Sequence, residues 1–152
     1  MPKTTIERAK DFLAQRRIAL VGVSRNPKHF SRVILRELLA RGYDVVPVNP
    51  LAGEVEGRRC AARVQEIEPP VAGALLVTPG IRTEEAVRDC AEAGIARVWI
   101  HRGAGAGAMT SEAVALAERS GLQVVANLCP FMVLPAAAWP HRVHGFVRRL
   151  SL

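Results

Sequence analysis

Short apolar runs alternate with amphipathic segments along most of the chain. Five runs are nearly continuous in apolar residues and rich in β-branched side chains: 18–23, 43–49, 72–78, 96–101 and 122–127. Strands that are buried on both faces of a parallel sheet lack the in–out alternation of half-exposed strands, so these runs predict such a sheet. Helices between successive strands would then cover both of its faces. We expect a doubly wound, mainly parallel five-stranded α/β sheet in three layers.

The segments between these runs have the periodicity of amphipathic helices. In Ser31–Arg41 the leucines and the isoleucine fall on one side, and the arginines and Glu37 fall on the other. A glycine directly after such a segment supplies a helix stop. This pattern predicts helices over Ser31–Arg41, Thr83–Ala93 and Thr110–Ser120. Ile6–Gln15 predicts one more helix before the first strand.

The chain of 152 residues fits one domain. After the last apolar run the sequence is broken by prolines and then becomes basic and amphipathic. We expect residues 131–152 to cover a sheet edge or a dimer partner.

Composition and charge narrow the function. The chain is 49% hydrophobic and 23% charged, and its net charge of +7 favours an anionic ligand. The basic excess is spread over both halves and only 5% of residues are aromatic, which disfavours nucleic acid and favours a small phosphorylated ligand. No apolar run reaches the roughly 20 residues of a membrane span, and the N-terminus lacks an apolar signal region. We expect a cytoplasmic protein.

Cys60, Cys90 and Cys129 are an odd count without paired spacing, which argues against a disulfide framework.

The loop after the first strand is the first candidate site. Ligands of open parallel sheets bind at the carboxyl ends of the strands, where the strand order reverses. Gly22 allows a tight turn there, and the following helix presents the positive end of its dipole to the crevice. Four residues could add donors to this anion seat: Ser24, Arg25, Lys28 and Ser31.

Two departures disfavour classical nicotinamide binding. Pro27 and Phe30 occupy the region where Gly-x-Gly-x-x-Gly would place further glycines. The second strand ends in Asn49-Pro50, and no carboxylate for ribose hydroxyls follows until Glu54.

Motifs at the ends of the predicted elements resemble a known family. They are Gly22-Val23-Ser24-x-x-Pro27, Arg41-Gly42-Tyr43, Pro47-Val48-Asn49-Pro50, and the later AVRDCAEAGIARVWIHRGA, AVALAERSGLQVVANLCPFM and HRVHGFVRR. The chain is similar, over roughly residues 7–150, to the CoA-binding domain family. This Rossmann-like module occurs in succinyl-CoA synthetase α subunits and in small stand-alone bacterial proteins.

The resemblance implies a ligand and a set of contacts. The Gly22–Ser24 turn would contact a CoA phosphate, with Ser31 nearby at the helix start. Asn49-Pro50 would line the adenosine or diphosphate side, and Val77-Thr78-Pro79 would lie along the nucleotide. The Arg102-Gly103 loop would approach the pantetheine arm. We add Arg25 and Lys28 to the cofactor-binding set on charge and position.

The sequence also departs from the family. Many relatives have the pattern W-x-Q-x-G, whereas this chain has His101 in the glutamine position. The stand-alone form lacks the second synthetase domain with its phosphorylated histidine, so ligase chemistry is not transferred.

A few residues suggest catalytic or metal chemistry. His101 and Cys129 follow predicted strands and could act on a CoA thioester or thiol. His141 and His144 are three residues apart, but with Cys129 they match no zinc spacing, and we expect no metal.

We therefore expect a protein that binds CoA or acyl-CoA without catalysis of its own. One alternative is an enzyme or ligase-like subunit that uses His101 or Cys129. Another is a nucleotide-responsive sensor that binds a protein partner.

Overall fold

A computed structural model describes residues 2–101 and 107–134 of the chain. The five expected strands pair in one parallel sheet of order β2-β1-β5-β6-β7. They are β1 (Arg17–Val21), β2 (Asp44–Val48), β5 (Gly73–Leu76), β6 (Arg97–Ile100) and β7 (Gln123–Ala126). The prediction of a doubly wound parallel sheet is confirmed.

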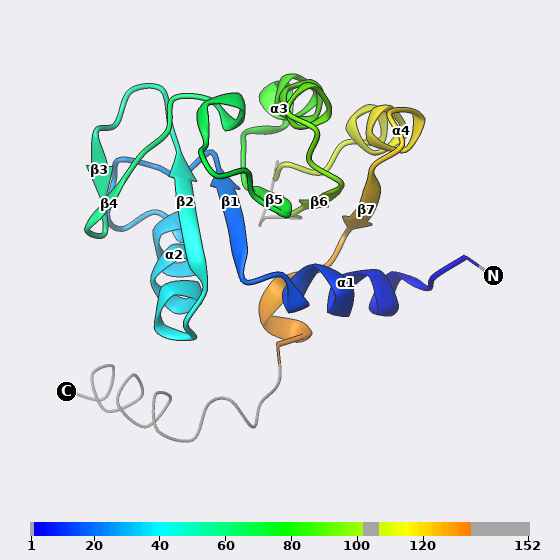
Figure 1. The fold of residues 1–152 in the computed structure, drawn as a ribbon, viewed down its shortest axis with the longest axis horizontal. Helices are drawn as coiled ribbons and strands as arrows, with labels where there is room; N and C mark the ends of the chain where they lie inside the picture. The colour runs from blue at the N-terminus through cyan, green and yellow to red at the C-terminus, as the bar shows by residue number, and fades with distance from the viewer. Residues whose placement is uncertain (1, 102–106, 135–152) are drawn as a thin grey trace.

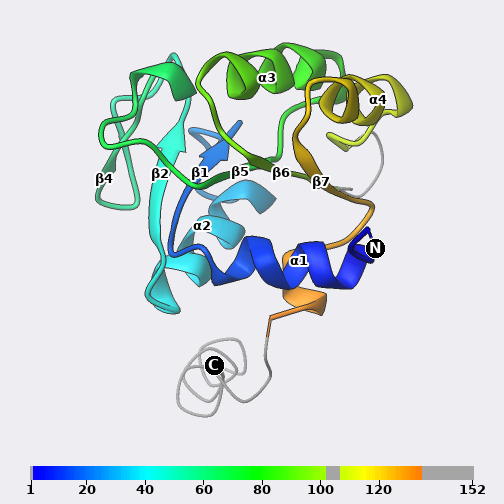
Figure 2. The ribbon, with the colours of Figure 1, turned by 45° about the vertical axis from the view of Figure 1, so that its right-hand side comes forward.

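Helices cover both faces of this sheet. They are α1 (Thr5–Ala14), α2 (Phe30–Ala40), α3 (Gly80–Glu92) and α4 (Ser111–Arg119). Helices α1 and α2 lie on one face and α3 and α4 on the other, which gives the three expected layers (Figures 1 and 2). Smaller elements complete the described chain: the hairpin β3 (Glu54–Val55) and β4 (Arg58–Arg59), and the 3-10 turns η1 (Val64–Glu66) and η2 (Pro130–Met132).

Each face of the sheet has its own apolar core, which explains why the strand sequences do not alternate. In β6, Val98 and Ile100 join the core beneath α3 and α4, whereas Trp99 joins the core beneath α1 and α2. All three side chains are fully buried. The ring of Phe12 from α1 meets Trp99 edge-on, with 5.5 Å between ring centroids. This geometry is a favourable one for two aromatic rings.

The strand order places a crevice at one edge of the sheet. The chain passes from β1 through α2 to β2 on one side, and then returns to β5 on the other side of β1. Loops that leave β1 and β5 therefore diverge to opposite faces, and the space between them is where open α/β sheets bind ligands.

Some boundaries differ from the prediction. Strand β1 ends at Val21, because Gly22 turns the chain with φ +94°. Helix α3 begins at Gly80 rather than Thr83. Thr83 lies inside the helix and is fully buried. Its hydroxyl is not left without a partner there, because it forms a 2.8 Å hydrogen bond with the hydroxyl of Thr78. The glycine-rich loop 102–106 and residues 135–152, most of the expected covering segment, lie outside the described residues.

Candidate functional site

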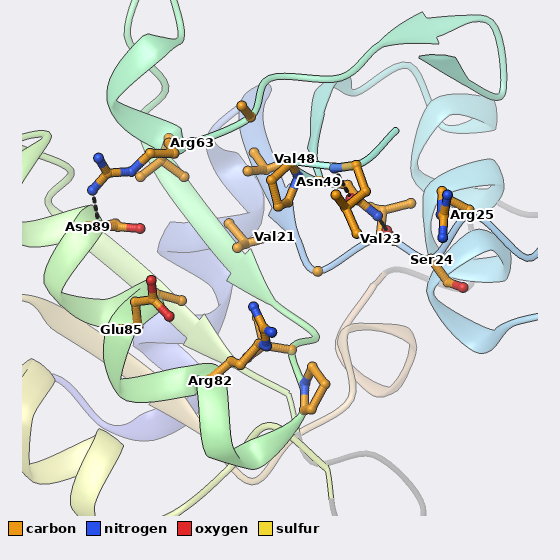
Figure 3. A pocket seen from close by; sticks show the side chains of 18 of the residues that line it. Val21, Val23, Ser24, Arg25, Val48, Asn49, Arg63, Arg82, Glu85 and Asp89 are labelled. Carbon is orange, nitrogen blue, oxygen red and sulfur yellow. Dashed lines mark hydrogen bonds and ion pairs between the residues drawn. The ribbon is translucent and has the colours of Figure 1, made fainter. Parts of the chain in front are cut away.

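An open cavity of about 890 Å³ lies at the carboxyl edge of the sheet, where the strand order reverses. Its walls come from the ends of β1, β2 and β5, the segment before η1, and one side of α3 (Figure 3). Eight of the twelve residues predicted to bind the cofactor line it: Gly22, Val23, Ser24, Arg25, Asn49, Pro50, Thr78 and Pro79. This arrangement brings three of the predicted loops together around one space.

The close approach of two backbones fixes the floor of the cavity at Gly22. A Cβ at this position would lie 2.9 Å from the backbone N and Cα of Thr78, closer than real Cβ atoms come. Its φ of +94° also lies in the left-handed region, where any residue with a Cβ atom is strained. Only glycine therefore lets the loop after β1 rest on the loop after β5.

The loop between Gly22 and α2 holds its shape through its own side chains. The Ser24 amide donates to the Ser31 hydroxyl at 2.9 Å, and the Asn26 amide donates to the Ser24 hydroxyl at 3.0 Å. The Lys28 amide donates to Asn26 Oδ1 at 3.0 Å, and His29 Nδ1 caps α2 by accepting from the Ser31 amide at 3.1 Å. These bonds make the loop before α2 rigid. The amides of Ser24, Asn26 and Lys28 are engaged within the loop itself.

A buried arginine ties this loop to the β3–β4 hairpin. The Nε of Arg32 donates to Glu56 at 2.9 Å, and its Nη2 pairs with the same carboxylate. Its Nη1 donates to the backbone carbonyls of Ser24 and Arg25 at 3.3 and 3.1 Å. The helical pattern placed Arg32 on the polar side of α2, but it is only 8% exposed. The hairpin supplies the partner that makes its burial tolerable.

Asn49 links the ends of β1 and β2. Its Nδ2 donates to the carbonyl of Val23 at 2.7 Å, and its Oδ1 accepts from the amide of Leu51 at 2.7 Å. Both ends of the amide thus hold the cavity wall in place. Pro50 and Leu51 extend this wall toward solvent, and Leu51 is 74% exposed.

Five charged side chains line the cavity: Arg25 on the loop after β1, Arg82, Glu85 and Asp89 on α3, and Arg63 before η1. Arg25 and Arg82 are exposed and have no acidic partner within the described chain, and Figure 3 shows the Arg82 guanidinium directed into the cavity. At the far wall Arg63 forms an ion pair with Asp89 at 2.8 Å. Buried aliphatic side chains form an apolar section of the cavity wall: Val21, Val48, Val64 and Ala86. Such a site suits a ligand that combines anionic groups with a flat apolar part.

The remaining predicted residues lie elsewhere. Lys28 is exposed on the same loop, and the Ser31 hydroxyl points into the loop, but neither lines the cavity. Arg102 and Gly103 lie outside the described residues, as do His141 and His144.

The two residues with candidate catalytic chemistry also lie off the cavity. His101 is 4% exposed, and its ring lies beside Phe30 with 5.5 Å between centroids. Burial lowers the pKa of its imidazole, so the ring is neutral near pH 7. Cys129 is half-buried directly before η2. Among the described residues, no group of three or more His, Cys, Asp or Glu side chains could hold a metal ion.

Sequence reasoning missed the wall of the cavity that α3 and Arg63 form. Arg82, Glu85, Ala86 and Asp89 all lie on one side of α3, and this spacing of three, four and seven residues was a readable signal. Arg63 had no comparable signal, because it follows a hairpin whose strands are two residues long.

No helix in the described part of the chain has the length and apolar character that crossing a membrane requires.

Comparisons with known proteins place this chain in a family. The model of the CoA binding domain matches residues 16–135. The uncharacterized protein YneT of Bacillus subtilis is 26% identical, over 75% of this chain and 82% of that protein. The alpha subunit of the ADP-forming acetate–CoA ligase II of Pyrococcus furiosus is 28% identical over 78% of this chain, which spans 27% of that subunit. The solved structure of a hypothetical protein from Pyrococcus horikoshii is 32% identical, with a TM-score of 0.77, over 88% of this chain and 96% of that one. The family model covers most of the chain, and the chain therefore belongs to the CoA-binding domain family.

Proposed function

We propose that this protein binds coenzyme A or an acyl-CoA in the cavity at the carboxyl edge of the sheet, without catalysis of its own. One observation carries the proposal: a cavity at the reversal of strand order is walled by the loops of the family motif and contains arginines that have no acidic partner among the described residues. The cavity and its arginines are independent of the family name, because they come from topology and charge.

The cavity fits such a ligand in size and chemistry. Its volume of about 890 Å³ lies within the roughly 300–1,000 Å³ of small-molecule sites. Arg25 and Arg82 would hold phosphate groups through charge-assisted hydrogen bonds, with the Ser24 hydroxyl beside them. The valine section would take the adenine ring, which is flat and largely apolar.

An exposed apolar side chain of the cavity wall supports an acyl-CoA as well as free CoA. Leu51 lines the cavity and is 74% exposed. An acyl chain that leaves the cavity beside Leu51 would cover part of this apolar surface. The three cysteines are free thiols, which suits the reducing cytoplasm that we propose as the location.

Isothermal titration calorimetry with CoA tests the binding. We expect saturable binding of one CoA per chain, and a loss of at least about tenfold in affinity for Arg25→Glu and Arg82→Glu, since each removes a charge-assisted contact. Arg119→Glu on α4 is the matched control: it makes the same charge change on an exposed residue away from the cavity, and we expect wild-type affinity. No heat of binding up to about 1 mM CoA would refute the proposal.

The absence of catalysis is tested separately. His101 and Cys129 do not line the cavity, which supports binding without turnover. We expect acyl-CoA hydrolysis and CoA–disulfide formation to stay at the background rate with the wild-type protein. Turnover that disappears in His101→Ala or Cys129→Ala would establish the enzyme alternative instead.

A further inference from the structure

The far wall of the cavity presents one carboxylate in a fixed position. Asp89 on α3 accepts from Arg63 Nη2 at 2.8 Å and from Gln65 Nε2 at 2.9 Å. Both bonds end on the same oxygen, Oδ1, and within the described chain no donor is bound to Oδ2. Two donors from the η1 segment therefore orient the carboxylate and leave one oxygen as an acceptor.

This carboxylate stands at the end of the apolar section, opposite Arg25 and the loop after β1. Figure 3 shows Val21 and Val48 between the Ser24–Arg25 loop on one side and the Arg63–Asp89 pair on the other. A nucleotide whose phosphates lie at the loop would place its base among the valines. The edge of that base would then face Asp89 and Arg63.

We infer that Asp89 is a specificity determinant that reads the base: its Oδ2 accepts a hydrogen bond from the 6-amino group of adenine. The inference rests on the proposed CoA site and deepens it. Adenine presents a donor at its 6-amino group and an acceptor at N7, whereas a 6-oxopurine presents acceptors at both positions. A carboxylate that faces position 6 attracts the amino group and repels the oxygen. Arg63 acts as a positioning residue, because its bond to Oδ1 orients the carboxylate.

Glu85 offers a matched control on the same helix. It lines the same cavity one turn before Asp89, it is exposed, and no hydrogen bond or ion pair from the described residues holds it. Glu85→Gln and Asp89→Asn therefore remove the same charge from the same cavity. Only the second change replaces the acceptor that faces the base with an amide, whose NH₂ group can donate to a 6-oxo group.

The experiment compares CoA with the CoA analogue whose 6-amino group is replaced by oxygen, by calorimetric titration of the full chain. For the wild type and Glu85→Gln we expect CoA to bind about tenfold more tightly than the analogue, the discrimination of a single base contact. For Asp89→Asn we expect the ratio to fall to about one, partly through tighter binding of the analogue. A misfolded variant could not produce that gain in affinity.

Four results would overturn the inference. Equal affinity of the wild type for CoA and the analogue would overturn it while leaving the proposed function intact. An unchanged ratio in Asp89→Asn, or an equal loss of discrimination in Glu85→Gln, would do the same. A wild-type protein that binds neither compound would overturn the proposed function and this inference with it.

Discussion

Replacing Arg32 with methionine removes one guanidinium. The change tests whether this guanidinium holds the β3–β4 hairpin to the loop after β1. Methionine keeps an unbranched apolar side chain in the place of the arginine stem, so the loss is confined mainly to the polar contacts. Those contacts are the pair with Glu56 and the bonds to the carbonyls of Ser24 and Arg25.

The expected cost follows from burial. The side chains of Arg32 and Glu56 are 10% and 19% exposed, so the pair lies closer to the buried limit, where breaking a pair costs roughly 3–5 kcal/mol, than to the surface limit. Arg36 also pairs with Glu56, at 3.3 Å, so the Glu56 carboxylate keeps one partner when Arg32 is replaced. We therefore expect Arg32→Met to lower the free energy of unfolding by about 2–3 kcal/mol.

Arg36→Met is the control within the same cluster. The side chain of Arg36 is 46% exposed, and exposed pairs contribute at most about 1 kcal/mol. Urea unfolding followed by circular dichroism should show a lower midpoint with an unchanged m-value for Arg32→Met, and a small shift for Arg36→Met. We also expect Arg32→Met to weaken CoA binding, although Arg32 does not line the cavity. Equal losses of stability in the two variants, or a loss below about 0.5 kcal/mol for Arg32→Met, would refute the reasoning.

Three other predictions concern the backbone, acid stability and thiol reactivity. Gly22→Ala should lower the free energy of unfolding in urea by more than about 2 kcal/mol, because it adds a clash with Thr78 to the backbone strain. At Gly57 φ is also positive but nothing lies within 4 Å of an added Cβ, so Gly57→Ala should cost about 1 kcal/mol. Similar losses of stability in the two variants would show that contact with Thr78 is not the cause. The hydrogen bond from Arg97, then that from Gln123, lowers the pKa of Asp11, so its contribution is present above the unfolded value of about 3.9 and is lost as the pH falls through the folded value. Asp11→Asn should therefore lower stability at pH 7 and flatten the acid-side loss in urea midpoints; a parallel curve would exclude Asp11 as a contributor. Burial raises the pKa of the Cys90 thiol to about 12, so iodoacetamide followed by mass spectrometry should label it only after unfolding; labelling of the folded protein at the rate of free cysteine would contradict its burial.

The sheet could be predicted from sequence because its strands are buried on both faces. Val98, Trp99 and Ile100 fill cores on opposite sides of β6, and this produces an unbroken apolar run. The hairpin β3–β4 could not be predicted, since strands of two residues are too short to show a period. For the same reason the burial of Arg32 was missed: its partner Glu56 belongs to that hairpin, 24 residues away.

The site divides in a similar way. The loops after β1, β2 and β5 were found because parallel strands bring their carboxyl ends to one edge, and that rule needs only the strand positions. The wall formed by Arg63 and Asp89 was missed, because it depends on how the chain returns from the hairpin to α3. The hydrogen bonds within the loop after β1, from the Ser24 amide to the Ser31 hydroxyl and from the Lys28 amide to Asn26 Oδ1, were not predicted, since they depend on the conformation of the loop.

A crystal structure of the protein with CoA tests the central claim most directly. The account predicts the phosphates of CoA beside Arg25 and Arg82, and the adenine among Val21, Val48 and Val64. CoA bound at another surface, or an empty cavity in crystals grown with saturating CoA, would contradict it.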